Sequence, residues 1–351
     1  MFARNPSIRP AAYNELYPPH RSTAAAEFAV KLPATVVSPP QLTPQQWLGT
    51  FCGLFSAVVY TAANGFLRAV SDCDPIWVSA MKAVPTAALM APWLIVSLRR
   101  GEGFPPPLIW LSIAATSLVG QLGGNISFQT ALGQIGLALT VPLSLGGMIV
   151  GSTLLSRVFL HEKVSPTAAI AVGVLLLSIA VLSMGADEAR EQLFLTATDN
   201  PLQLTLGVTA ACCSGLAYSV LNVVIRYSIQ RGATLPATLM TVAVVGLFSL
   251  SAISLQRIGI AGMLQTSPRD MTMMMLAGVC NAGAFVGLTR CLQLTSVVYA
   301  NALNAAQAAM AALAGVLIFN EPASAALNAG VALTVLGLVI LTRRPREPPE
   351  V

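Results

Sequence analysis

Long apolar runs, separated by short polar segments, fill most of the chain after its first 45 residues. A run of about 18 or more apolar residues is long enough to cross a bilayer as a helix. On this basis we predict ten spans, at residues 47–67, 75–98, 108–132, 136–160, 165–184, 202–227, 235–255, 271–294, 297–319 and 324–342. The runs are continuous and lack the alternation of a membrane β-barrel. The pattern therefore predicts an all-α membrane protein with ten transmembrane helices.

The composition says what surrounds these helices. Hydrophobic residues make up 55% of the chain and charged residues only 9%. A soluble domain carries about 25% charged residues. A chain so poor in charge cannot cover a surface that faces water, so we expect the lipid bilayer to enclose it. The basic residues do not cluster with aromatic residues, which makes nucleic acid a poor candidate for a partner.

Polar segments divide the chain. Residues 1–45 are polar, rich in proline and without the apolar core of a cleaved signal peptide, so we predict a disordered cytoplasmic tail there. The other predicted parts are a first five-helix repeat at 46–185, a central extracytoplasmic loop at 186–200, a second five-helix repeat at 201–343 and a cytoplasmic tail at 344–351.

The basic residues predict the orientation. With the amino terminus in the cytoplasm, fourteen of the nineteen Lys and Arg residues fall in cytoplasmic segments and four fall outside, with Lys82 inside a span. Cytoplasmic loops of membrane proteins are enriched in Lys and Arg. We therefore expect a multi-pass protein of the cell (inner or plasma) membrane with both termini in the cytoplasm.

Two patterns occur twice along the chain. The first is a stripe of Ser, Tyr, Asn and Arg at steps of four, at Ser56, Tyr60, Asn64 and Arg68 and again at Ser214, Tyr218, Asn222 and Arg226. The copies lie 158 residues apart, and a second pair of motifs, starting at Glu162 and Glu321, lies 159 residues apart. Each predicted repeat has five spans, an odd number, so the halves are expected to have opposite orientations. Inverted repeats of this kind are typical of secondary transporters.

These motifs also resemble a known family. The first half carries Phe128-x2-Ala131-Leu132, then Pro142, then Phe159-Leu-His-Glu162-Lys-Val-Ser165 leading to Gly173. The second half carries Leu317-Ile-Phe-Asn-Glu321-Pro-Ala-Ser324 leading to Gly330 and Gly337. The chain, over residues 46–342, resembles the drug/metabolite transporter superfamily, specifically its EamA-type proteins with two five-helix repeats. The resemblance implies a ten-helix transporter of small metabolites, and the ninth span departs from it by lacking the proline of the fourth.

One charged side chain lies well inside a predicted span, away from the span ends. Lys82 stands about seven residues inside the second span, where a charge costs about 2.5–3.5 kcal/mol at the bilayer centre. Its side chain either snorkels to the interface, or faces a central cavity and holds an anionic group of a solute.

Polar side chains at steps of four line one face of several spans. The two Tyr-Asn pairs either join neighbouring helices or line a cavity, and we favour the cavity. The same two alternatives stay open for the amides of the third and ninth spans, which must face protein or water. Asn281 is isolated in the eighth span, and we expect it to be structural. The candidate substrate-binding residues are Lys82, Tyr60, Asn64, Gln121, Asn125, Tyr218, Asn222, Asn301 and Asn304.

Other charged residues are expected to be structural, and the motifs of common enzyme classes are missing from the sequence. Glu162 and Glu321 precede helix starts and are read as turn residues, and the arginines of the two stripes as interface anchors. No acidic residue lies in the middle of a span. The chain has no phosphate-binding loop, no metal-binding histidine pair and no nucleophile elbow, so no cofactor is implied and an enzyme is not expected.

The sequence therefore predicts a secondary transporter for a small neutral, zwitterionic or anionic metabolite, an amino acid or a related compound. Two alternatives are kept. One is an intramembrane enzyme on a lipid-linked substrate, with Asp72 and Asp74 beside Lys82 as its acids. The other is a non-transporting membrane sensor. The direction of transport, the coupling ion and the oligomeric state, a homodimer included, are left open.

Overall fold

The structure is a computed structural model that describes residues 44–102, 105–162, 164–194, 201–319 and 325–342. All of them belong to one compact unit, Pro40–Val351. The predicted tails at 1–45 and 344–351 lie almost entirely outside the described residues, as does Glu321.

Every element of the described residues is helical. The elements are α1 (Pro44–Arg68), α2 (Pro75–Met81), α3 (Ala83–Arg99), α4 (Pro107–Leu118), the π-helix η1 (Val119–Ile126), α5 (Ser127–Phe159), α6 (Pro166–Phe194), α7 (Pro201–Gln230), α8 (Leu235–Leu264), α9 (Pro268–Leu294), α10 (Val297–Asn304), α11 (Ala306–Phe319) and α12 (Ala325–Thr342).

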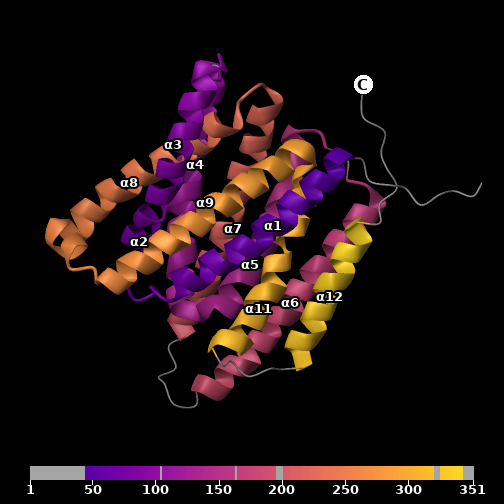
Figure 1. Cartoon of the computed structure of the whole chain (residues 1–351). Coiled ribbons are helices and arrows are strands. Elements are labelled where there is room, and N and C mark those ends of the chain that lie inside the picture. The colour runs from indigo at the N-terminus through magenta and orange to yellow at the C-terminus, as the bar shows by residue number, and fades with distance from the viewer. Residues whose placement is uncertain (1–43, 103–104, 163, 195–200, 320–324, 343–351) are drawn as a thin grey trace, which may run out of the picture. The chain divides into compact units, whose positions relative to one another are not determined.

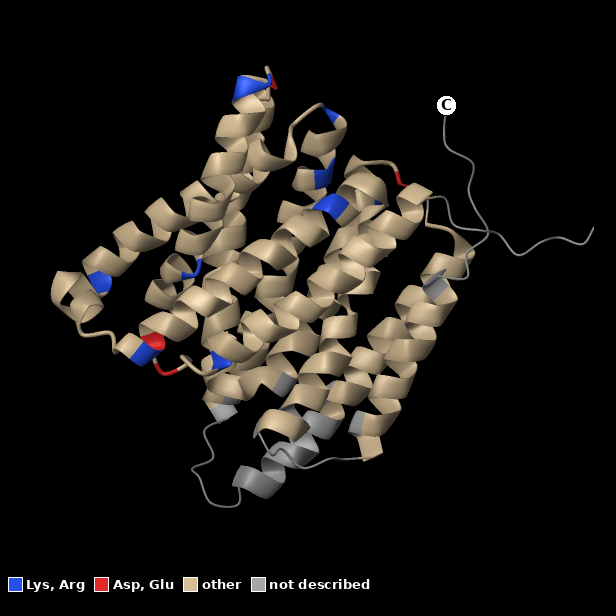
Figure 2. Cartoon of the chain, viewed as in Figure 1, with Lys and Arg blue, Asp and Glu red and all other residues tan. Residues whose placement is uncertain are grey.

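The helices confirm a polytopic membrane protein. In the described part of the chain, eight helices are long and apolar enough to cross a bilayer. Two shorter apolar helices, Pro166–Leu182 and Asn328–Ile340, coincide with the predicted fifth and tenth spans. Figure 2 shows that charged residues gather towards the ends of the helices, while the middle is almost free of them. The count of ten spans and the orientation stay predictions.

The helices pack in pairs that are distant in sequence (Figure 1). Helix α1 lies along α9, α5 along α7, and α6 along α12, while α8 packs against α2, α3 and α4. Small residues allow the closest of these approaches. A Cβ atom on Gly215 of α7 would stand 2.0 Å from the carbonyl oxygen of Ser144, and one on Gly147 of α5 would stand 2.9 Å from the carbonyl oxygen of Cys212. The α5–α7 contact therefore depends on glycine.

Several predicted spans are interrupted. The second span is locally irregular at Lys82, between α2 and α3, although the backbone there stays in the right-handed helical region (φ −65°, ψ −19°). Pro85 explains this irregularity, because a proline has no N–H to donate to the carbonyl of the residue four positions earlier. The third span contains η1, a π-helical stretch that includes three glycines. The ninth span breaks at Ala305, where no proline is nearby.

Two predicted boundaries differ from the structure. The predicted third and fourth spans leave residues 133–135 for the turn between them, and the chain instead turns at Gly136, whose φ of 73° suits a residue without a side chain. The loop predicted at 186–200 is partly helical, because α6 continues to Phe194. The polar composition of this segment obscured the helix, which extends past the apolar part of the span.

Candidate functional site

A cavity of ≈ 140 Å³ lies where the three interruptions meet. Lys82 lines it from the α2–α3 break, Gly120, Gln121 and Asn125 line it from η1, and Asn304 lines it from the end of α10. Irregular backbone at membrane depth is tolerated where it lines a cavity, and π-helical turns are frequent at functional sites. A volume of this size suits a small ligand, since an engineered cavity of about 150 Å³ binds benzene.

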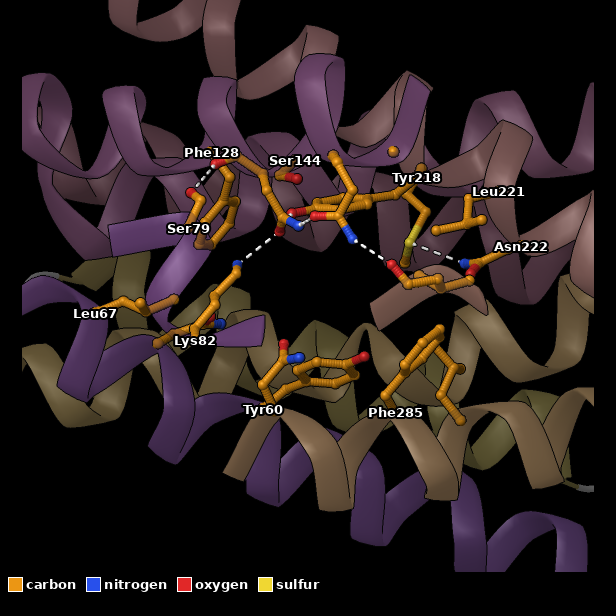
Figure 3. Close-up of a pocket in the computed structure, with 18 of the residues that line it drawn as sticks. Tyr60, Leu67, Ser79, Lys82, Phe128, Ser144, Tyr218, Leu221, Asn222 and Phe285 are labelled. Carbon is orange, nitrogen blue, oxygen red and sulfur yellow. Dashed lines mark hydrogen bonds between the residues drawn. The ribbon is translucent and has the colours of Figure 1, made fainter. Parts of the chain in front are cut away.

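Lys82 is the charged centre of this cavity. Its side chain is only 5% exposed, and its Nζ donates to Oδ1 of Asn125 at 2.6 Å. Figure 3 shows the ammonium pointing into the central space, with Tyr60, Asn222 and Phe285 around it. This placement fits the cavity-facing alternative for Lys82 and contradicts the snorkelling one.

Asn125 connects three helical segments. Its Oδ1 accepts from Lys82 and also from the hydroxyl of Tyr218 at 2.6 Å. Its Nδ2 donates to Oε1 of Gln121, whose own Nε2 donates to the carbonyl oxygen of Val242 at 3.2 Å. One amide therefore links the α2–α3 break, η1 and α7, and through Gln121 it also reaches α8. A ligand that took over Oδ1 would disturb this whole network.

Two further amides, those of Asn64 and Asn222, line the cavity. Asn64 Nδ2 donates to Oε1 of Gln307 at 3.3 Å. Asn222 Nδ2 donates to Oδ1 of Asn301 at 3.0 Å and contacts Sδ of Met148 at 3.5 Å. These bonds hold the two repeated asparagines against the broken ninth span and against α5.

Some buried polar atoms in and beside the cavity have no hydrogen-bond partner among the residues that the structure describes. They include Oγ1 of Thr86 and Oδ1 of Asn304, whose residues both line the cavity, and Nδ2 of Asn301 next to it. Thr86 is 4% exposed and Asn304 is 3% exposed. A buried polar atom without a partner costs about 1–3 kcal/mol, so a polar ligand that paired with these atoms would recover that cost.

Eight of the nine candidate residues line the cavity. The ninth, Asn301, stands behind the wall and holds Asn222. Asn281, which we expect to be structural, also lines the cavity. Sequence reasoning did not select Ser79, Thr86, Phe128, Ser144, Phe285 and Gln307, which line it too. Serine, threonine and phenylalanine are common in spans, so only the Gln307 amide gave a usable signal, as a third amide in the ninth span.

The electrostatics of the cavity are one-sided. Among the described residues, no Asp or Glu lines it. Neither Asp72 nor Asp74, the acids of the alternative enzyme, is part of the wall. Asp74 instead accepts from the N–H groups of Ile76 and Trp77 at 3.0 Å, and forms an ion pair with Arg257 at 2.9 Å. In the described part of the chain, no group of three or more metal-ligating side chains comes together.

The comparisons with known proteins establish the fold and no more. No family model matches the chain, and no curated protein matches it. Chains of solved structures do match. One of them, described as a crystal structure of a protein, has a TM-score of 0.61 at 17% sequence identity, and the match covers 84% of this chain and 98% of the other chain. The fold thus belongs to a recurrent class of helical bundle, and at this identity the similarity carries no function.

Proposed function

We propose that this protein is a secondary transporter that moves a small neutral, zwitterionic or anionic metabolite, an amino acid or a related compound, by alternating access. The observation that carries the proposal is the buried ammonium of Lys82 in a cavity where three interrupted helices meet. Substrate sites of secondary transporters typically lie near the bilayer midplane, between the two repeats. The ten-span topology, cytoplasmic termini and kinship with EamA-type transporters belong to the same proposal.

The pattern of helix packing supports an inverted repeat. In a repeat of five spans, α1 corresponds to α7, α2 and α3 to α8, α4 with η1 to α9, α5 to α10 with α11, and α6 to α12. When each helix is replaced by its counterpart in the other repeat, the contact of α1 with α9 becomes a contact of α7 with α4 and η1. In the same way, the contact of α1 with α10 and α11 becomes a contact of α7 with α5. The α6–α12 and α3–α8 contacts map onto themselves. Each of these contacts is present, as expected if the halves are related.

Side chains at equivalent positions support the same relation. Gln307 lies 159 residues after Met148, the offset that relates Glu321 to Glu162. Asn64 contacts Gln307, and its counterpart Asn222 contacts Met148. The two contacts are therefore equivalent. Each joins the first span of one half, which carries the asparagine, to the fourth span of the other half.

Charge limits the class of solute. A permanent cation would have to lose its water beside Lys82, with no carboxylate among the described wall residues to offset several kcal/mol of desolvation. An anionic or zwitterionic solute could place its carboxylate at the ammonium. A neutral polar solute could bind to the amides alone.

The proposal is tested on purified full-length protein with a panel of metabolites. Amino acids, carboxylic acids, neutral polar compounds and quaternary ammonium compounds are compared by their effect on the thermal unfolding midpoint. Ligands found in this way are then followed as radiolabelled solutes in proteoliposomes. Saturable uptake or exchange of a compound from the first three classes is expected. Saturable transport of a quaternary ammonium compound would contradict the charge argument.

A further inference from the structure

Beyond the cavity, an ion pair joins several helix ends. Arg226 lies near the end of α7, and Glu162 follows the end of α5. The distance between Nε of Arg226 and Oε1 of Glu162 is 3.6 Å. The other carboxylate oxygen of Glu162 accepts from the backbone N–H of Val297 at the start of α10, at 3.1 Å. Nη1 of Arg226 donates to the carbonyl oxygens of Leu292 at 2.5 Å and Gln293 at 3.0 Å, at the end of α9. Two side chains thus tie α5, α7, α9 and α10 together.

This cluster stands directly beyond one end of the cavity. Arg226 follows the cavity residue Asn222 by four positions, and Leu292 follows the cavity residue Leu288 by four. In a helix, four positions are about one turn, or about 6 Å along the axis. The side chains of Arg226 and Glu162 are only 17% and 13% exposed. The cluster therefore closes the helix ends one turn past the cavity wall.

The opposite stripe has no such cluster in the described part of the chain. Arg68 holds the position in α1 that Arg226 holds in α7, four residues after the asparagine of its stripe. Its Nη1 donates to Oγ of Ser71 at 2.7 Å, a residue of its own turn. Two arginines that the sequence relates to each other are thus used differently, and the expectation that both are plain interface anchors is wrong for Arg226.

The ion pair has features of a contact that can open. Among the described residues, Oε1 of Glu162 and Nε of Arg226 have no hydrogen-bond partner, although both atoms are buried. Taking two charges out of water is costly, and a pair recovers the cost only with good geometry and full hydrogen bonding. The desolvation cost therefore offsets much of the attraction between the two charges. A ligand can shift the equilibrium between two states that differ by a few kcal/mol.

We propose that Arg226 and Glu162 form a latch that holds the cavity shut at this end of the bundle, and that the latch opens when the cavity turns to that side. The inference rests on the transport function proposed above and adds how one side of the pathway is closed. It assigns Arg226 and Glu162 a positioning role, because neither lines the cavity.

The latch is tested without any solute, by the reactivity of a cysteine in the cavity. The six native cysteines are replaced by serine or alanine in the full-length protein, and Ser144, which lines the cavity, is changed to cysteine. Its labelling by a membrane-impermeant maleimide is measured from each side, in oriented vesicles. Glu162→Gln and Arg226→Met are expected to raise labelling from the Arg226 side by roughly tenfold, the factor that about 1.4 kcal/mol produces in an equilibrium.

Two controls separate the latch from general damage. Arg157→Met removes an exposed basic residue from the last turn of α5 and should leave the labelling rate unchanged. Arg226→Lys keeps the charge but cannot bind both carbonyls and Glu162 together, so it should give an intermediate labelling rate. It replaces Arg226→Met if that variant does not fold.

Unchanged labelling in all latch variants, or an equal rise in Arg157→Met, overturns the latch. If the wild type is labelled from both sides but the latch variants match it, only the latch fails. Labelling from one side alone in every protein contradicts both the latch and the transport proposal.

Discussion

The ammonium of Lys82 donates to the side-chain oxygen of Asn125 at 2.6 Å, from the break between α2 and α3 to the π-helix η1. The two residues lie on different spans, and each stands at an irregularity of its own helix. The bond places the charged centre of the cavity beside an amide that also holds Tyr218. The site thus lies where irregular points of several helices come together.

Removing the ammonium is expected to select among ligands. Lys82→Met should weaken binding of an anionic or zwitterionic solute by roughly 10- to 150-fold, because a hydrogen bond to a charged group contributes about 1.5–3 kcal/mol. Binding of a neutral solute should be spared, and Lys82→Arg should retain part of the anion binding. Ligand-dependent shifts in the thermal unfolding midpoint measure all three. Equal losses for neutral and anionic ligands would mean that Lys82 is only structural.

The ring of Tyr218 depends on a glycine in η1. A Cβ atom on Gly124 would stand 2.7 Å from Cε1 of Tyr218, so Gly124→Ala should displace the ring and break its bond to Asn125. We expect ligand binding to weaken by roughly 5- to 150-fold, since a buried polar group left unpaired costs about 1–3 kcal/mol. Gly65→Ala in α1 is the matched control, because a Cβ there meets no atom within 4 Å. A similar loss in both variants would contradict the role of the ring.

The two repeated asparagines are expected to lie on opposite sides of the pathway. If α1 and α7 run in opposite directions, Asn64 faces the outer path and Asn222 the inner path. Cysteines at these positions, each alone in a protein without other reactive thiols, should react with a polar reagent from opposite sides. Labelling of both from the same side, under every condition tried, would count against alternating access.

The latch should respond to mild acid. Burial raises the pKa of the Glu162 carboxyl, against the opposing effects of Arg226 and of the Val297 N–H. The ion pair needs the carboxylate, so it is intact above this raised pKa and is lost as the pH falls through it, before an exposed glutamate would be protonated. The groups that face Glu162 are Arg226 and the Val297 N–H, and the thiol of Cys291 lies near Arg226.

We therefore expect the labelling of Ser144→Cys from the Arg226 side to increase as the pH is lowered, and to do so above the pH range in which an exposed glutamate is protonated. Rates are normalised to the unfolded protein, because the thiol itself reacts more slowly in acid. Glu162→Gln should label fast at every pH and lose this dependence. A pH profile that Glu162→Gln leaves unchanged would assign the effect to another group.

Topology can be tested with reporter fusions. Fusions after Gly101 and after Arg231 should report the cytoplasm, and fusions within 186–200 should report the outside. Because α6 continues to Phe194, the segment 195–200 is the best insertion point in that range. A cytoplasmic signal from the central segment would overturn the ten-span arrangement and the inverted repeat together.

The sequence by itself determined the class of protein and most of the polar set. Apolar runs of about 20 residues and a charged fraction of 9% leave no other solvent than lipid for these helices. Because an amide or an ammonium inside a span must face protein or water, the polar residues could be assigned to the interior before any helix was placed. That is why eight of the nine candidate residues line one cavity.

Only the tertiary structure decided which of these groups meet. A residue's spacing fixes its face on its own helix and says nothing of which neighbouring helix faces it. The bond of Lys82 to Asn125, the place of Asn301 behind the wall and the pairing of Arg226 with Glu162 all join spans distant in sequence. The irregularities at η1 and at Ala305 were equally hidden, because no proline marks them in the sequence.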